Sequence, residues 1–380
     1  MTNELLAENE LLIRNTVRDF SDQALAPRAA KYDGNEQFPL DNIQGLSELG
    51  LFGLTVAERY GGGGGTTRQL AIVSEEIARG CAATSVIYIA HLALCTQFIH
   101  TVGNEVQKKK YLPVLCSAEK IGAFALTEPE SGSDAAAMRT SAIIEGDNYI
   151  INGTKHFITN APDADIFILI ATQDYKLRSK AVDAIIVEKG SNGMTVRPMH
   201  GKMGIRASSV AEITFEDCHV PVENRIGEER DGFKETMEML NLSRIYIAAQ
   251  AVGIAQASYE AAISYAKYRK AFGTNLSDFQ GIRWILSDMA TNIEAARLLV
   301  QKAATLKDNG LPFVTEASMA KLFASRIAVE SADKALQIHG GIGYFAPTPV
   351  ERYYRDAKVT EIYEGSSEIQ KLIIARNILG

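Results

Sequence analysis

The sequence predicts an α+β fold in which a small antiparallel sheet domain lies between two helical parts of the chain. Three observations support this prediction: a helical pattern before residue 119, short β-rich runs separated by turn residues after it, and long alanine-rich stretches near the end. A chain of 380 residues exceeds one ordinary core. We therefore expect an N-terminal helical domain at 1–119, a middle β domain at 120–230 and a C-terminal helical bundle at 231–380.

The N-terminal part has a helical pattern from residue 3 to about residue 118, with interruptions expected at Pro27, Pro39 and the five-glycine run 61–65. The glycine run predicts a loop. It is not a phosphate-binding P-loop, because no Lys-Ser or Lys-Thr pair follows it. Residues 74–102 predict one long helix that is apolar on most faces and therefore buried.

The middle part alternates short apolar runs with turn signals such as Gly146-Asp147-Asn148 and Asn152-Gly153. This pattern predicts an antiparallel sheet, closed into a barrel or packed as a sandwich. The expected strands are 149–151, 156–159, 166–170, 184–187 and 212–215.

The C-terminal part contains no proline between Pro221 and Pro312, and its stretches 240–267 and 280–306 are rich in alanine with isoleucine, valine and tyrosine. Alanine favours helices and allows close approach between them. We expect these helices to pack as a bundle.

Composition excludes several classes of protein. The formal net charge is −7, and the longest basic run is Lys108-Lys109-Lys110, so nucleic-acid binding has no electrostatic support. No stretch is expected to span a membrane. Residues 1–18 are acidic and amphipathic, unlike a signal or transit peptide, with Leu5 among the apolar positions of one helix face. The four cysteines form no CxxC pair, and no histidines have metal-ligand spacing. We therefore expect a cytoplasmic protein without a metal site.

The most informative motif is residues 362–370, Ile-Tyr-Glu-Gly-Ser-Ser-Glu-Ile-Gln. Glu364 lies between an aromatic ring and a glycine that permits a sharp turn. Shielding of its carboxylate by Tyr363 and Ile362 would raise its pKa and suit it to accept a proton near neutral pH. The same residues are also typical of a helix N-terminus, with Ser366 or Ser367 as the cap. Both interpretations stay open on the motif alone.

Two segments of the middle domain predict a ligand site. Residues 124–134 are dense in hydroxyls and turn residues, which is typical of an anion or heteroaromatic site but also of a plain polar turn. In 155–160, Phe157 and Thr159 share one face of a strand, where a ring can stack on a flat ligand and a hydroxyl can bond its edge.

Two segments of the bundle carry similar ambiguity. Arg269 with Phe272, followed by Gln280, suits a phosphate and an adenine, although a charged helix end gives the same pattern. The glycine-rich segment 337–344 is also compatible with a helix C-cap, and His339 alone is more typical of structure than of catalysis.

In combination and in this order, these segments resemble the acyl-CoA dehydrogenase family over essentially the whole chain. The resemblance depends on 124–134, on Phe157-Ile158-Thr159-Asn160 and on 362–370. It also depends on Arg244-Ile245, on Arg269 with Phe272-Gly273 and Gln280, and on Gln337 with His339-Gly340-Gly341.

The resemblance implies an N-terminal helical domain, a middle β domain and a C-terminal four-helix bundle, assembled as a homotetramer with one FAD per subunit. Phe157 stands where many members carry Trp beside the flavin, and Thr159 where a hydroxyl bonds the ring nitrogen that receives hydride. Several bundle contacts reach a neighbouring subunit's FAD. The implied cofactor contacts are Phe124, Leu126, Thr127, Ser133, Phe157, Thr159, Arg269, Phe272, Gln280, Gln337, Gly340, Gly341, Ser366 and Glu368.

By the same likeness, Glu364 is the base that removes the α-proton of an acyl-CoA thioester. A minority of members place the base on the first bundle helix, where this chain has Ser243, which cannot act as one. Hydride passes from the β-carbon to FAD, the product is a trans-2-enoyl-CoA, and an electron-transferring flavoprotein reoxidises the cofactor. The base's own amide and a ribityl hydroxyl polarise the thioester carbonyl. The implied substrate contacts are Ser133, Asn241, Arg244, Tyr363 and Gly365.

The alternative hypotheses are a relative with altered chemistry (an oxidase, a desulfinase or a decarboxylating dicarboxyl-CoA dehydrogenase) and a silent helical scaffold. Glu364 argues against a desulfinase. A dicarboxyl-CoA enzyme needs a cation at the pocket floor. The pocket helix implied by the resemblance, 87–99, contains no Arg or Lys, and only a protonated His91 would serve. Bulk at Gln97-Phe98 and 92–94 favours a short, branched or cyclic acyl group.

Overall fold

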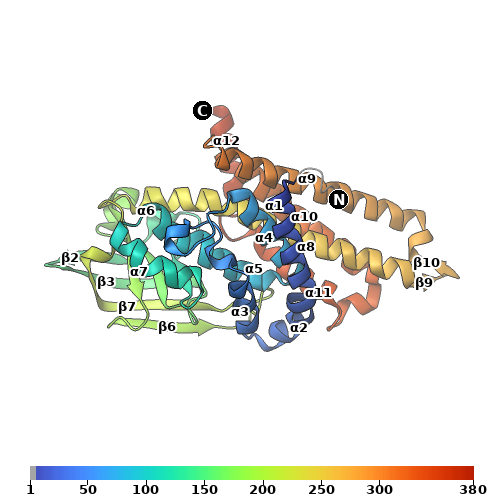
Figure 1. The fold of residues 1–380 in the computed structure, drawn as a ribbon, viewed down its shortest axis with the longest axis horizontal. Helices are drawn as coiled ribbons and strands as arrows, with labels where there is room; N and C mark the ends of the chain where they lie inside the picture. Colours follow the sequence, from blue (N-terminus) through green and yellow to red (C-terminus); the bar gives the residue numbers. More distant parts are fainter. Residues whose placement is uncertain (1–5) are drawn as a thin grey trace.

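The protein was analysed as a computed structural model, which describes residues 6–380. Leu5, one of the apolar positions predicted for the first helix, lies outside the described residues. Figure 1 shows a sheet at one end of the molecule's long axis and the N-terminal helices near the centre of the molecule. The long C-terminal helices extend to the other end. The predicted sequence of helices, sheet and helices is therefore confirmed.

The N-terminal helices differ from the prediction at two places. Pro27 does not interrupt the chain, because it lies at the start of α2 directly after a π-helical turn at Ser21–Leu25, where its missing N–H leaves no bond unmade. The predicted helix 74–102 breaks at Cys81, whose backbone is extended. Apart from the π-helical turn and two short 3-10 helices, η3 (Leu51–Gly53) and η4 (Glu58–Tyr60), the helical elements before the sheet are α1 (Glu8–Phe20), α2 (Ala26–Asn35), α3 (Leu40–Glu48), α4 (Thr67–Gly80), α5 (Ala82–Ile89), η5 (Ala90–Thr96), α6 (Gln97–Val102) and α7 (Glu105–Cys116).

The stretch Ala82–Val102 runs through α5, η5 and α6. Its length and composition would suffice to cross a membrane, contrary to the expectation from the sequence, but almost all of it is buried inside the protein. It supplies Ile87, Leu92 and Phe98 to the main core. This burial identifies it as the core helix of a folded domain.

The middle of the chain forms one eight-stranded sheet with the order β6-β7-β3-β2-β4-β5-β8, in which β1 also pairs with β4. Most pairings are antiparallel as predicted, but β1 and β2 run parallel to β4. The strands are β1 (Gly122–Ala125), β2 (Ser141–Glu145), β3 (Asn148–Thr159), β4 (Ile166–Thr172), β5 (Val182–Glu188), β6 (Met194–Met199), β7 (Val210–Pro221) and β8 (Arg225–Ile226).

The two strands predicted at 149–151 and 156–159 are one strand, β3. Asn152-Gly153 is not a turn but an irregularity in the pairing with β7, where the register shifts after Ile151. Gly153 adopts φ 141°, and a Cβ there would lie 2.6 Å from the Thr140 Cα. The glycine is needed for this close approach of two backbones, which is a common use of glycine in a strand.

The C-terminal part contains three long helices, α8 (Gly232–Tyr268), α9 (Gln280–Asp308) and α10 (Val314–His339), followed by the shorter α11 (Pro349–Lys358) and α12 (Ser367–Leu379). A small antiparallel pair, β9 (Lys270–Ala271) and β10 (Thr274–Asn275), caps the end that lies far from the sheet (Figure 1). Buried alanines along α8 and α10 permit the close packing that the composition predicts.

Close packing between α4 and α8 depends on Gly253. A Cβ at this position would collide with the carbonyl oxygen of Glu75 and lie 2.8 Å from the Ala78 Cβ. We expect Gly253→Ala to lower the free energy of unfolding by about 1–3 kcal/mol, because the two helices must separate. Urea unfolding followed by circular dichroism measures this change.

Gly281 is a matched control, since it lies in α9 and a Cβ added there would have nothing within 4 Å of it. Gly281→Ala should change stability by less than about 1 kcal/mol, and in the stabilising direction. Equal effects of the two substitutions would contradict the packing argument.

Candidate active site

A left-handed turn between η11 (Val359–Glu361) and α12 carries Glu364. Glu364 has φ 55° and Gly365 has φ 92°. Positive φ is uncommon for a residue other than glycine and is often found at functional sites. Ser366 occupies the N-cap position of α12, as one interpretation predicted, but its hydroxyl does not bond the helix amides. The turn therefore both begins the helix and directs the Glu364 carboxylate into the protein.

Glu364 accepts a hydrogen bond from the Ser243 hydroxyl of α8, with 2.5 Å between Oγ and Oε2. Protein atoms surround the carboxylate although the residue keeps some accessible surface. Burial raises the pKa of Glu364 above its usual value, against the opposing influence of Ser243, Arg244 and Lys321. The predicted direction of the pKa shift is confirmed.

The two residues predicted to shield the carboxylate lie in different surroundings. Tyr363 packs against the core and donates a hydrogen bond to the side-chain carbonyl of Gln250. Ile362 is 58% exposed and faces a separate pocket, so it does not cover the carboxylate.

Arg244 is buried in α8, which rules out the interpretation of this residue as a surface charge. One of its terminal nitrogens donates to the Asn241 side chain, and its Nε has no hydrogen-bond partner among residues 6–380. No ion pair within the described chain joins it to a carboxylate. A buried cation with spare donors beside Glu364 suits an anionic or carbonyl-bearing ligand.

Hydrogen bonds and an ion pair join the two predicted ligand segments of the middle domain, 124–134 and 155–160. The His156 amide donates to the Thr127 carbonyl at 2.7 Å. The buried Lys155 ammonium donates to the Leu126 carbonyl at 2.9 Å and to Glu128 at 2.8 Å. Residues 124–134 are therefore not a free polar turn, because a buried ion pair and a backbone bond hold them against β3.

Together the segments 124–134 and 155–160 expose an aromatic ring and several hydroxyls that are not hydrogen-bonded within the described residues. Phe157 has φ 58° and is 63% exposed, and its ring lies 4.1 Å from that of His156. The hydroxyls of Thr127, Ser133 and Thr159 enter no hydrogen bond within the described part of the chain. Asn160, after the strand, donates to the carbonyls of α5 and β1 and so holds this end of β3 in place. An exposed ring with unused donors fits the isoalloxazine of a flavin.

Phe124 belongs to the core as well as to the segment predicted to bind the ligand. Its side chain is buried in the core, with its ring 6.0 Å from that of Phe98, so only its backbone can face a ligand.

The six predicted contacts in the bundle lie together at the end capped by β9 and β10, away from the sheet (Figure 1). His339 stacks on Tyr265 with 4.2 Å between ring centroids, which joins the end of α10 to α8. Phe272 is 98% exposed at the tip of the hairpin. Within one chain, the structure does not bring this end together with Phe157 or Glu364. The six residues, none of them buried, are Arg269, Phe272, Gln280, Gln337, Gly340 and Gly341.

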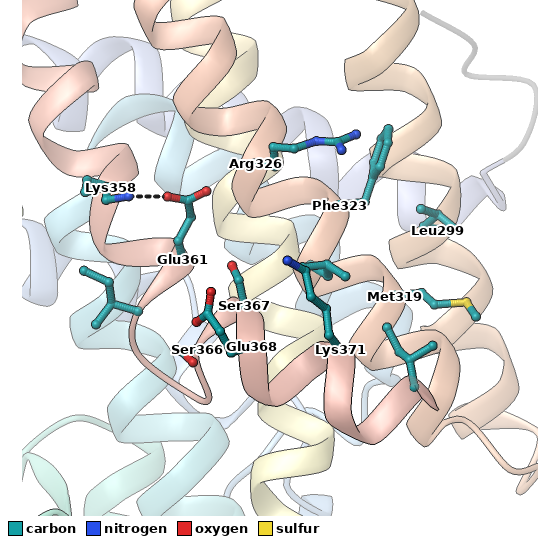
Figure 2. Close-up of a pocket in the computed structure, with 13 residues that line it drawn as sticks. Leu299, Met319, Phe323, Arg326, Lys358, Glu361, Ser366, Ser367, Glu368 and Lys371 are labelled. Carbon is teal, nitrogen blue, oxygen red and sulfur yellow. Dashed lines mark hydrogen bonds and ion pairs between the residues drawn. The ribbon is translucent and has the colours of Figure 1, made fainter. Parts of the chain in front are cut away.

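Ser366 and Glu368 line a pocket of about 720 Å³ between α9, α10 and α12. Figure 2 shows both residues facing this space, together with Arg326 and Lys371 and with the ion pair of Lys358 and Glu361. Glu364 is not part of the lining. The Glu364 carboxylate of the turn and the Glu368 side chain of α12 therefore lie in different surroundings.

His91 does not provide a cation at the pocket helix. Its Nδ1 accepts from the Gly122 amide at 3.0 Å, so the proton resides on Nε2, which donates to the Leu115 carbonyl at 2.9 Å. Burial lowers the pKa of His91 to about 4. The protonated His91 that a dicarboxyl substrate would need is therefore absent near neutral pH.

Three family models match this chain, one for each part of the fold. The N-terminal domain of acyl-CoA dehydrogenases matches residues 7–119, the middle domain matches 123–218 and the C-terminal domain matches 230–379. Together they span almost the whole sequence.

The chain belongs to the acyl-CoA dehydrogenase family.

Relatives within the family agree in sequence and shape. A short-chain specific acyl-CoA dehydrogenase of Clostridium acetobutylicum is 47% identical over 373 residues, which is 98% of each sequence. The structure of butyryl-CoA dehydrogenase from Megasphaera elsdenii superposes with a TM-score of 0.96 at 40% identity, over 100% of both chains. A chain described under "Electron transferring flavoprotein of Acidaminococcus fermentans" gives a TM-score of 0.97, also at 40% identity and 100% coverage.

Membership of the acyl-CoA dehydrogenase family makes the protein an FAD-dependent oxidoreductase. The exposed Phe157 and the unused hydroxyls around it fit this cofactor on structural grounds.

Several residues of this acyl-CoA dehydrogenase site were missed in the sequence. Lys321 of α10 and Lys155 of β3 are fully buried lysines, and Gln250 of α8 is a buried amide. Lys321 could have been found from its spacing, because Ala317, Ala324 and Ala328 place it on the buried face of its helix.

The buried ion pair that holds residues 124–134 against β3 gives a stability prediction. Burial lowers the pKa of Lys155 to about 8, and Glu128 also accepts from the amides of Arg139 and Thr140. Lys155→Met leaves the Glu128 charge buried without its partner, so we expect a loss of about 3–5 kcal/mol in urea unfolding. The exposed pair of Lys110 and Glu188 is the control, and Lys110→Met should cost less than about 1 kcal/mol. Similar losses in both variants would contradict the account.

Proposed function

We propose that this protein dehydrogenates an acyl-CoA thioester at its α and β carbons, giving a trans-2-enoyl-CoA, with Glu364 as the base that removes the α-proton. One observation carries the proposal: the Glu364 carboxylate is enclosed, its pKa is raised, and it lies in a left-handed turn beside buried donors. A carboxylate with a raised pKa is a suitable proton acceptor near neutral pH. Ser243, the nearest residue of α8, bonds the base and cannot replace it.

The α-hydrogen of a thioester is a weak acid, so the carbonyl needs hydrogen-bond donors while the proton leaves. The Glu364 amide enters no backbone hydrogen bond within residues 6–380 and lies beside its own carboxylate. We assign it as one donor to the thioester oxygen, since a donor placed where charge develops stabilises an enolate-like transition state. Arg244 and Asn241 lie close by on α8, and we assign them to substrate binding or to support of the base.

FAD, when bound, accepts the hydride from the β-carbon. Toward this cofactor, we assign Phe157 to stacking beside the flavin and Thr159, Thr127 and Ser133 to hydrogen bonds at its edge. Phe124 and Leu126 contribute backbone groups. Tyr363 and Gly365 face the substrate side and restrict water around Glu364.

We further propose a short acyl group as the substrate. His91 is neutral and buried, so the implied pocket helix offers no charge for a second carboxylate. The short-chain specific relative and the butyryl-CoA dehydrogenase structure support the same size class. Branched or cyclic groups of similar size fit the same argument.

The exposed residues of the bundle end support a shared cofactor site. Arg269, Phe272 and Gln337 lie away from Phe157 within one chain, so we propose that they contact the FAD of a neighbouring subunit in a homotetramer. Ser366 and Glu368 would contact the chain's own FAD. We also propose an electron-transferring flavoprotein as the electron acceptor and a cytoplasmic location.

Replacing Glu364 with glutamine tests the base directly. Glu364→Gln should keep FAD bound but slow anaerobic reduction of the flavin by butyryl-CoA by at least about 10³-fold, because an amide cannot take the proton. Loss of flavin absorbance in a stopped-flow instrument measures the rate. Glu330→Gln, an exposed carboxylate on α10 paired with Arg326, should retain the wild-type rate. Turnover by Glu364→Gln near the wild-type level would refute the assignment.

A panel of acyl-CoAs with an artificial electron acceptor tests the substrate class. We expect kcat/KM for butyryl-CoA to exceed that for palmitoyl-CoA by at least about tenfold, since each buried methylene that fails to fit costs roughly 1 kcal/mol or more. Glutaryl-CoA should give little turnover. A preference for glutaryl-CoA would contradict the neutral state of His91.

A further inference from the structure

Lys321 is a buried lysine that the proposed mechanism does not use. It lies in the middle of α10, is fully buried, and donates from Nζ to the Gly365 carbonyl at 2.8 Å. No carboxylate lies within ion-pair distance of it in the described chain. A lysine buried without such a partner is costly, whereas an apolar side chain of similar shape is not. Its position therefore calls for a reason other than packing.

The carbonyl that Lys321 holds belongs to the catalytic turn. Gly365 is the second of two consecutive left-handed residues, and Glu364 is the first. The same carbonyl accepts a second bond at 2.7 Å from the Gln370 side chain in the first turns of α12. Two side chains from different helices thus fix the peptide group that follows Gly365, and Gln370 also donates to the Glu364 carbonyl at 3.4 Å, so the backbone of the turn on both sides of Gly365 is restrained.

Charged groups approach this turn from every element packed against it. The charges of Glu364, Arg244 of α8, Glu361 of η11 and Glu368 of α12 all act on the Lys321 ammonium, although burial has the largest effect and lowers its pKa to about 8. Glu364 in turn faces Ser243, Arg244 and Lys321. Arg244 and Lys321 are the two cations around the carboxylate, and both favour its ionised form.

We propose that Lys321 is a positioning residue for the base: its ammonium fixes the Gly365 carbonyl, which holds Glu364 in its left-handed conformation, and its charge keeps that carboxylate ready to accept a proton. This inference rests on the proposed role of Glu364. Lys321 acts through the turn and does not itself contact the substrate.

The test uses the FAD-loaded enzyme with Lys321→Met, which keeps the length of the side chain, and Lys321→Gln, which keeps a neutral donor. In the Lys321→Met variant, butyryl-CoA should reduce the flavin at a rate about 10²-fold lower than in the wild-type enzyme, because the base is misplaced. The acid limb of its kcat/KM profile should move to higher pH, since removal of a cation raises the pKa of Glu364. Lys321→Gln should recover part of the rate but none of the shift of the acid limb.

A readout that is independent of activity is hydrogen exchange at the amides of 362–366, which should accelerate in Lys321→Met. Lys334→Met is the control, because Lys334 lies on the same helix, is half exposed and forms an ion pair with Asp333. It should leave the rate, the pH profile and the exchange unchanged.

A wild-type rate and pH profile in both Lys321 variants, with unchanged exchange at 362–366, would overturn the positioning role. A wild-type enzyme whose flavin is not reduced by any acyl-CoA would instead refute the proposed function, and the exchange measurement would still decide whether Lys321 holds the turn.

Discussion

The site depends on one constraint, the left-handed backbone of Glu364 and Gly365. A residue with a side chain adopts this conformation only where its surroundings impose it. Here the restraints come from three helices far apart in the sequence: Ser243 of α8 bonds the carboxylate, Lys321 of α10 bonds the turn carbonyl, and Gln370 of α12 bonds it again. The packing of these helices is therefore what positions the carboxylate.

In the middle domain, a buried ion pair holds the predicted ligand segment in place. Lys155 and Glu128, with the bond from the His156 amide, hold the segment after β1 against β3. The strand can then end in an exposed ring and free hydroxyls although its pairing with β7 shifts register between Lys155 and Ile158. The two parts of the site are thus held in place differently. Packing between helices holds the turn of Glu364, and a buried ion pair holds residues 124–134 against β3. Rigid supports of this kind keep a reacting geometry within tight limits.

The order of the helical and β parts, four of the eight strands (β3, β4, β5 and β7) and the motif at 362–370 were predictable, because periodicity and turn residues are local signals. Strands β1, β2, β6 and β8 were not among the predicted strands. The interpretation of Asn152-Gly153 as a turn was wrong because only the neighbouring Thr140 backbone explains that glycine. Ile362 was wrong as a shield because its side chain is exposed and lines the separate pocket of Ser366 and Glu368. The burial of Lys321 was predictable from its spacing, but its bond to the Gly365 carbonyl was not, because that bond depends on how α10 packs against the turn before α12. Long-range packing, rather than local pattern, decided each of these differences.

An experimental structure of the protein with FAD and an unreactive thioester analogue of butyryl-CoA tests the account most directly. The account predicts Glu364 and Gly365 with positive φ, Lys321 bonded to the Gly365 carbonyl, and a Glu364 carboxylate oxygen within about 3.5 Å of the α-carbon. A turn rebuilt on ligand binding, or a Glu364 carboxylate directed away from the α-carbon, would contradict it.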